Sequence, residues 1–335
     1  MNKKITISDI AQLSGVSKTT VSHFLNQKYE GMSEATRNRI QKIVDELEYR
    51  PNRQARALKS QHSSIVGISV ADISNSYTSR ILKGMMDCLK NTQYHTVIMD
   101  ADLNKAREQS NVDKLLDEQV DGILIQPLGE GSTDYNRIPS TLPVVQIDRY
   151  VEPLIWPAVV SDNFIQSRNL SQLFLEKDYQ RIIVVTPPID HASPRVNRYQ
   201  GLKDALADTD VEIIPIITPE IKDIVAQDKE IWEQISPYIN DKVKTVIYAF
   251  NGGLLYGVIK FLKYHYIAVP EKVGVVGYDD GSWADLMNPA ITSIEQDPVQ
   301  IGYKAAEMLL DNIRNNSQIP ELICVDSKLN IHKSL

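Results

Sequence analysis

Residues 6–25 read TISDIAQLSGVSKTTVSHFL, the pattern of two short helices joined by a tight turn. Thr6 is suited to cap the first helix, and Asp9 stands where a side chain completes a capping box. Gly15 tolerates the left-handed conformation that ends a helix, and Ser17 is suited to cap the next one. The sequence therefore predicts a helix-turn-helix near the N-terminus.

The second of these helices should run from Lys18 to about Leu25. Val21 and Leu25 are four residues apart and should pack on the first helix. The residues left on the opposite face are Lys18, Thr19, Ser22 and His23. All of them can form hydrogen bonds, as a recognition helix in a major groove requires. The pattern alone leaves a second interpretation open, the solvated face of a small helical bundle.

A third helix is expected from about Glu34 to Leu47, capped by Ser33 and with Ile40 and Val44 facing inward. Pro51 ends this all-α headpiece at about residue 50. Residues 52–59 have a helix-forming composition but fall short of the roughly 12–15 residues that an isolated helix needs in water. Residues 51–62 are therefore predicted to be a linker that orders only when something holds it.

Charge is divided unevenly along the 335-residue chain. Residues 1–62 carry 11 Lys/Arg and 6 Asp/Glu, net +5, whereas the remainder carries 25 and 37, net −12. A basic head on an acidic body indicates that only the head meets a polyanion. The sequence shows neither a long apolar run nor an export signal, so a cytoplasmic protein is expected. Cys88 and Cys324 match no metal or redox spacing and are expected to be buried in a reducing compartment.

From residue 63 onward strands and helices alternate, which predicts an α/β fold of parallel sheets with crossover helices. The expected strands are Ile65–Val70, Thr96–Asp100, Gly122–Gln126, Val144–Asp148, Arg181–Thr186, Val211–Ile217, Thr245–Phe250 and Val273–Tyr278. The clearest helical patterns are Ser79–Lys90, Lys105–Glu118, Arg198–Ala207 and Leu254–Tyr264. About eight strand–helix units are more than one sheet usually holds, and two doubly wound lobes are therefore expected. Their predicted extents are 63–162 plus about 292–324, and about 163–291 plus 325–335. Ligands of such folds bind beyond the carboxyl ends of the strands, here in the cleft between the lobes.

Residues 5–60 closely resemble the headpiece of the lactose-repressor (LacI) family, from Ile5-Thr6-Ile7-Ser8-Asp9 through Val16-Ser17-Lys18-Thr19-Thr20 to Tyr49-Arg50-Pro51-Asn52. The similarity continues along the whole chain. It implies a homodimer on a pseudo-palindromic operator, and a linker that folds into a hinge helix on DNA. Leu58 takes the place of the apolar wedge that enters the minor groove. Packing of Leu58 on its dimer mate is the alternative.

The resemblance also implies roles for individual headpiece residues. Lys18, Thr19 and His23 take the base-reading positions, where His23 replaces the more usual Arg and lacks its bidentate fork. The expected phosphate or groove contacts are Asn26, Arg53 and Arg56.

The body resembles the family's core, which is similar to periplasmic sugar-binding proteins. Polar residues at its strand ends correspond to the family's ligand sites and supply paired amides, carboxylates and Arg forks. The expected effector-binding residues are Asn75, Tyr77, Asp148, Arg149, Arg195, Arg198, Asn251, Asp279 and Gln296, with Tyr77 or Trp283 as an aromatic wall. Taken singly, Asp148-Arg149 could be a surface ion pair, Asn251 a helix cap and Asp279 a turn former.

Two departures from the family pattern bear on the effector. Gly252 follows Asn251 where an Asp is frequent, and Arg195 is an additional cation near Arg198. With fewer acids and up to three arginines, the effector is expected to be a sugar acid or sugar phosphate, with a neutral sugar as the alternative. The Tyr29-Glu30-Gly31-Met32 insertion weakly resembles ketogluconate-type regulators.

Other functions fit the sequence less well. An enzyme is not expected, because the sequence carries neither a His-Glu-x-x-His pattern, a phosphate-binding Gly loop with Lys, nor a Gly-x-Ser-x-Gly elbow. Cofactors and catalytic or metal-binding residues are not expected either. A regulator that needs a corepressor and docks a phosphocarrier protein stays open, as does a sugar-binding protein that does not bind DNA. Induction versus corepression, and dimer versus tetramer, also stay open.

Overall fold

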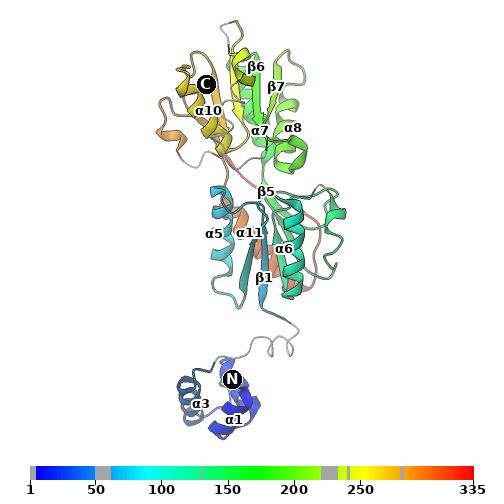
Figure 1. The fold of residues 1–335 in the computed structure, drawn as a ribbon, viewed down its shortest axis with the longest axis vertical. Coiled ribbons are helices and arrows are strands. Elements are labelled where there is room, and N and C mark those ends of the chain that lie inside the picture. The colour runs from blue at the N-terminus through cyan, green and yellow to red at the C-terminus, as the bar shows by residue number, and fades with distance from the viewer. Residues whose placement is uncertain (1–4, 50–61, 130, 220–232, 240–241, 280–282) are drawn as a thin grey trace. The chain divides into compact units, whose positions relative to one another are not determined.

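The computed structural model describes residues 5–49, 62–129, 131–219, 233–239, 242–279 and 283–335. The chain forms two compact units, Met1–Ser64 and Ile65–Leu335 (Figure 1).

The N-terminal unit is the predicted three-helix headpiece, and all three helices begin at the expected caps. It contains α1 (Ile7–Ser14), α2 (Lys18–Leu25) and α3 (Glu34–Glu46). Thr6 and Asp9 form the capping box, in which the Thr6 amide donates to Asp9 Oδ2 at 2.8 Å. Gly15 ends α1 with a φ of 64°, and Ser17 Oγ accepts the Thr20 amide at 3.0 Å. These caps satisfy backbone groups that a helix end would otherwise leave unpaired.

The headpiece core forms where the three helices meet. Its buried residues are Ile10, Ala11, Val21, Phe24 and Ile40. Leu25, expected to face inward with Val21, is only partly buried, because Phe24 fills the space nearer the centre. One side of α2 is therefore committed to the core.

The C-terminal unit contains two six-stranded sheets with helices on both faces. The first sheet has the order β11 (Leu322–Val325), β5 (Ala158–Ser161), β4 (Val144–Ile147), β3 (Gly122–Ile125), β1 (Ile65–Val70) and β2 (His95–Asp100). The second has the order β12 (Lys328–Asn330), β10 (Thr292–Glu295), β9 (Gly274–Tyr278), β8 (Thr245–Ala249), β6 (Arg181–Thr186) and β7 (Glu212–Ile217). All neighbouring strands are parallel except β10 and β12. The two sheets thus share one strand order, and every strand predicted from the sequence is present.

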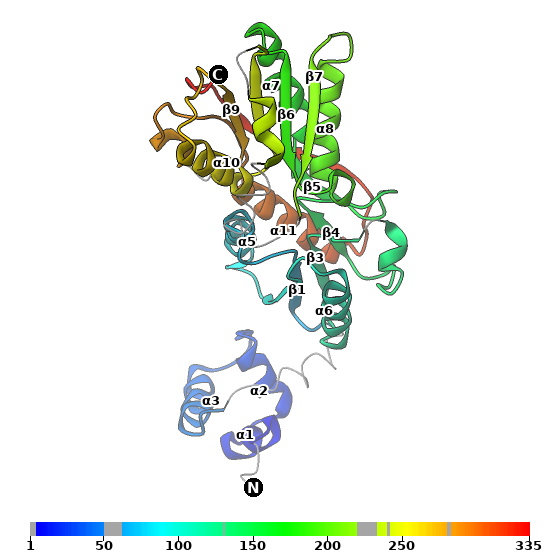
Figure 2. The same ribbon diagram turned by 45° about the horizontal axis from the view of Figure 1, so that its top comes forward.

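Each sheet defines one lobe (Figure 2). The first lobe comprises residues 65–161 and 298–325 and includes α5 (Ser76–Leu89), α6 (Lys105–Asp117) and α11 (Pro298–Asn315). The second lobe comprises residues 163–295 and 328–335 and includes α7 (Asn163–Glu176), α8 (Ser193–Ala205) and α10 (Gly252–Tyr264). The short 3₁₀ turns are Ser132–Tyr135, Ile189–His191, Ser236–Tyr238 and Ala284–Leu286.

The second crossing between the lobes differs from the sequence prediction. The return to the first lobe was expected at about residue 292, but β10 pairs with β9 and β12 in the second sheet. The chain crosses only after Glu295, because residues 292–295 form β10, which lies between β9 and the edge strand β12.

The two cysteines are more accessible than expected. Cys88 is half-buried against the first-lobe core, and Cys324 is exposed because β11 lies at a sheet edge. Among the described residues, none of the helices combines the length and the apolar character needed to cross a membrane.

Candidate functional site

The outer face of α2 presents polar side chains to solvent. Lys18, Thr19 and His23 are exposed, and Ser22 is half-buried. Asn26 ends the helix and donates through Nδ2 to the Ser22 carbonyl at 2.8 Å, so its amide closes the last turn. The geometry of a short helix with one buried and one polar face is therefore present. The other expected DNA contacts, Arg53, Arg56 and Leu58, lie outside the described residues.

A cavity of about 530 Å³ lies where the strands of both lobes end. All nine expected effector-binding residues line it: Asn75, Tyr77, Asp148, Arg149, Arg195, Arg198, Asn251, Asp279 and Gln296. Carboxyl ends of parallel strands meet at one sheet edge, which explains why residues far apart in sequence gather here. The cavity is large enough for a sugar-sized molecule.

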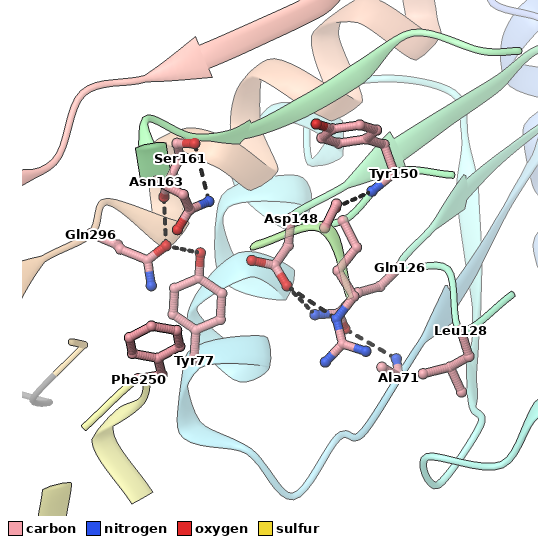
Figure 3. Close-up of polar contacts among 12 residues, drawn as sticks. Ala71, Tyr77, Gln126, Leu128, Asp148, Tyr150, Ser161, Asn163, Phe250 and Gln296 are labelled. Carbon is pink, nitrogen blue, oxygen red and sulfur yellow. Dashed lines mark hydrogen bonds and ion pairs between the residues drawn. The ribbon is translucent and has the colours of Figure 1, made fainter. Parts of the chain in front are cut away.

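In the first lobe three strand ends are held together by one glutamine (Figure 3). Gln126 Oε1 accepts the Ala71 amide at 3.0 Å, while its Nε2 donates to Asp148 Oδ2 at 2.8 Å. Arg149 Nε lies 3.7 Å from the same carboxylate oxygen. Asp148 and Arg149 therefore form an ion pair. Because both side chains are largely buried and line the cavity, this is not a surface ion pair.

A second polar group joins the first lobe to the crossing after β10. Tyr77 Oη donates to Gln296 Oε1 at 3.1 Å, and Ser161 Oγ donates to the same oxygen at 2.6 Å (Figure 3). Burial is the main cause that raises the pKa of Tyr77 well above its ordinary value of 10.0. The phenol therefore stays protonated and keeps its role as a donor, and its ring contributes to the cavity wall.

The second lobe supplies two further arginines from α8. Arg198 is only 5% exposed. Its Nε donates to Asn163 Oδ1 at 2.8 Å, an Nη1 donates to the Phe250 carbonyl, and its guanidinium lies 3.5 Å from the centre of the Tyr278 ring. Arg195 donates to the Pro188 carbonyl at 2.8 Å. Arg198 is thus fixed in place by its surroundings.

Two of the expected ligand residues also serve as helix caps. Asn251 Oδ1 accepts the Leu254 amide at 2.8 Å, and Asn75 Oδ1 accepts the Tyr77 amide at 2.9 Å. The helix-cap interpretation of Asn251 is therefore correct, and the residue also lines the cavity. Asp279 follows β9 with a φ of 62°, as a turn former does, and also lines the cavity.

Sequence reasoning missed several residues of the site. Gln126 is the last residue of the predicted strand Gly122–Gln126 and directly follows the observed β3, so a rule that includes the final strand residue would have found it. Phe250 ends another strand, whereas Tyr256 lies inside α10 and gives no such signal. The Tyr256 ring meets Trp283 edge to face at 5.8 Å, so these two rings form the aromatic wall.

A buried carboxyl group stands behind the first-lobe wall. Glu108 of α6 is 2% exposed; Oε2 accepts the Leu128 amide at 2.7 Å and Oε1 accepts Tyr135 Oη at 2.6 Å. Burial raises the pKa of Glu108 above its ordinary value of 4.5, while these hydrogen bonds and the Arg149 charge act against the rise. The described residues offer no cluster of His, Cys, Asp or Glu that could hold a metal ion.

Both units of the chain match families of known proteins. Residues 6–52 match the family model "Bacterial regulatory proteins, lacI family", and residues 172–335 match the "Periplasmic binding protein-like domain". The transcriptional regulator KdgR of Bacillus subtilis is 28% identical, over 98% of this chain and 97% of that protein. The regulator PtxS of Pseudomonas putida is 27% identical, over 94% and 91% of the two chains.

Solved structures agree with the fold. The lac repressor dimer bound to operator and the anti-inducer ONPF superposes with a TM-score of 0.85, at 20% identity over 99% of both chains. A periplasmic binding protein/LacI regulator from Alkaliphilus metalliredigens, complexed with D-xylulofuranose, gives 0.70 at 23% identity over 81% of this chain and 98% of that one. With a lacI-type helix-turn-helix domain followed by a periplasmic-binding-protein-like domain, the chain belongs to the LacI family of transcription regulators.

Proposed function

We propose that this regulator binds a pseudo-palindromic operator as a homodimer and controls transcription, most simply as a repressor, in response to a small sugar-like effector. One observation carries the proposal: a helix with a polar exposed face and a cavity lined by amides, carboxylates and arginines occur in the same chain. The first suits a major groove and the second suits a hydroxyl-rich ligand. A protein that binds chromosomal DNA works in the cytoplasm, where we place it.

Each part of the headpiece has a proposed role. Lys18, Thr19 and Ser22 contact base edges, and His23 reads its base pair through a single hydrogen bond, since it lacks an Arg fork. The proposed phosphate contacts are Asn26, Arg53 and Arg56. Leu58, in the linker of residues 51–62, is proposed to enter the minor groove as a wedge.

Ligand control requires that the cavity and the linker influence each other. We propose that ligand in the cavity changes how the two lobes close, which changes the spacing of the two linkers of the dimer. A marginal helix melts after a small shift, because it needs both its partner and DNA. A coupling of about 1–3 kcal/mol is enough for such control.

Selection from a pool of random duplexes tests the DNA-binding part. The full-length protein should enrich a pseudo-palindromic motif, and a Lys18→Ala variant should enrich a motif that is less specific at one base pair of each half-site. A selection by the full-length protein that enriches no motif would contradict the proposed function.

A further inference from the structure

Arg149 differs from the other two arginines of the cavity. It follows β4 in a tight turn, in which its amide donates to the Ile147 carbonyl at 2.6 Å and Asp148 has a φ of 62°. This turn places Arg149 in the cavity lining, where its side chain is 15% exposed. Within the part of the chain that the structure describes, its guanidinium makes no hydrogen bond; its only close partner is Asp148, 3.7 Å away.

The acids near Arg149 are engaged elsewhere. Asp148 Oδ2, the oxygen nearest the guanidinium, accepts Gln126 Nε2 at 2.8 Å. Glu108, on which the Arg149 charge also acts, gives one oxygen to the Leu128 amide and the other to Tyr135 Oη. Both acids therefore offset the Arg149 charge without occupying its N–H groups. A largely buried guanidinium without acceptors is costly, so the five donors of Arg149 are ready for a ligand.

The two arginines of α8 are less available. Arg198 gives donors to Asn163 and Phe250 and stacks on Tyr278, and Arg195 gives a donor to Pro188. Their hydrogen bonds fix the second-lobe wall. Among the described lining residues, Arg149 is the arginine for which no such bond is present, and a planar fork matches two oxygens of one acidic group.

We propose that the effector is a sugar acid whose carboxylate is bound by Arg149, a proposal that rests on the proposed function of the cavity. Between the two acidic chemistries, charge balance favours a carboxylate over a phosphate ester. The described lining residues include three arginines, Arg149, Arg195 and Arg198, and three acids, Asp72, Asp148 and Asp279. A monoanion adds one charge to this balanced lining, whereas a phosphate ester adds nearly two.

Matched ligands separate the three chemistries. Glucuronate, glucose and glucose 6-phosphate share one ring and differ at one carbon, as do galacturonate, galactose and galactose 6-phosphate. Gluconate with glucitol, and 2-ketogluconate with fructose, extend the comparison to other acids. Affinities for the full-length protein are measured by calorimetry and by intrinsic tryptophan fluorescence, to which the cavity residue Trp283 contributes.

At least one acid should bind at least 10-fold more tightly than its neutral counterpart and, for glucuronate and galacturonate, than the phosphorylated counterpart. Arg149→Gln should lower the affinity for that acid about 10- to 100-fold, the range expected for hydrogen bonds to a charged group. The affinity for the neutral counterpart should change by no more than a few-fold. Arg149→Lys should recover part of the preference, because it restores the charge but not the fork. Arg137→Gln, which removes an exposed arginine paired with Asp113 outside the cavity, should bind as wild type does.

Three results would overturn the proposal: tighter binding of a neutral sugar or a phosphate, binding of none of the acids, or equal losses for acid and neutral ligand in Arg149→Gln. Far-ultraviolet circular dichroism and operator binding confirm that each variant is folded. Operator selection by the same preparation keeps the two proposals apart. If the protein selects a palindrome but prefers neutral sugars, only the proposal that Arg149 binds a carboxylate is refuted. If it selects no sequence, the proposed function is refuted.

Discussion

Asp148 and Asp279 occupy equivalent positions in the two lobes. Each directly follows the third strand of its sheet in spatial order, each has a φ of 62°, and each amide donates at 2.8 Å to a carbonyl on the adjacent strand, Val159 or Ile294. The left-handed conformation is uncommon outside glycine but is tolerated by Asp and Asn. The fold has thus placed one carboxylate at the same strand end of each lobe, on the same cavity.

The backbone at Asp148 gives a first prediction. Asp148→Asn should keep the left-handed turn, whereas Asp148→Ala should be less stable than the Asn variant by about 1–2 kcal/mol. Both variants lose the charge beside Arg149, and the Ala variant also loses the acceptor of Gln126 Nε2, so their difference combines the strain of the turn with that hydrogen bond. Urea unfolding of the two proteins measures it, and equal midpoints and slopes would show that the turn is not strained.

Glu108 predicts a dependence of stability on pH. Burial raises the pKa of Glu108 above 4.5, so the folded state holds this proton more tightly than the unfolded state does. The stability contributed is present below pH 4.5 and is lost as the pH rises through the raised pKa of the folded state. Glu108→Gln, which mimics the protonated form, should therefore gain stability relative to wild type between pH 4.5 and neutrality.

Chemical unfolding at several pH values in this window measures that difference. Glu118→Gln is the matched control, because Glu118 is exposed at the other end of the same helix and should follow wild type. A constant difference between Glu108→Gln and wild type across the window would exclude a role for Glu108 in the pH dependence.

Tyr150 predicts a link between the lobes. Its amide donates to Ser193 Oγ at 2.9 Å and its hydroxyl accepts Asn197 Nδ2 at 3.2 Å, so a first-lobe residue bonds directly to α8 of the second lobe. Tyr150→Phe removes the second bond and should weaken ligand binding about three- to tenfold, because the joined arrangement of the lobes becomes less favourable.

Calorimetry with the tightest ligand from the matched panel measures this effect. Tyr264→Phe removes the same hydroxyl from a side chain that is 78% exposed and should not change affinity. Identical affinities of wild type and Tyr150→Phe would mean that the contact does not bear on ligand binding.

Lys18 provides the headpiece prediction. Lys18→Ala should weaken binding to the selected operator by about 10-fold or more and relax the preference at one base pair, as loss of a base contact does. Lys42→Ala removes an equally exposed lysine from α3, where it pairs with Glu46, and should change the affinity much less. Anisotropy titrations on the operator and on its single-base variants compare the two protein variants. An equal loss of affinity on all sequences would instead mean that Lys18 contacts a phosphate.

Much of this fold was predictable from the sequence because its signals are local. The caps at Thr6, Ser17 and Ser33 begin the three headpiece helices, and the apolar runs of the central parallel strands correctly indicate buried strands. Short strands were missed: β5, β10, β11 and β12 have only three or four residues each. Their pairing depends on partners distant in sequence, which also explains the misplaced crossing at residue 292. The long helix α11 was likewise not predicted, although Ile301, Ala305 and Leu309 repeat at helical spacing.

The candidate site was predictable to the extent that its residues follow the ends of parallel strands. Most of the nine expected residues line the cavity because polar residues at parallel strand ends converge, whereas Arg195 and Arg198 lie on α8 and were expected from the family resemblance. Glu108 was missed, although it shares the buried stripe of α6 with Asn111, Val112 and Leu115. From the sequence alone, a glutamate on a helix is expected to be exposed to solvent. Its burial depends on the loop that brings Leu128 and Tyr135 into contact with it, which the sequence does not reveal.

The most direct test of the account is operator affinity with and without the effector. Anisotropy of the full-length protein should show a preference of roughly 1,000-fold or more for its selected palindrome over a random duplex at moderate salt. The tightest ligand from the matched panel should change the operator affinity by about 5- to 150-fold. An operator affinity that is the same with and without saturating ligand would contradict the claim that the cavity controls the headpiece.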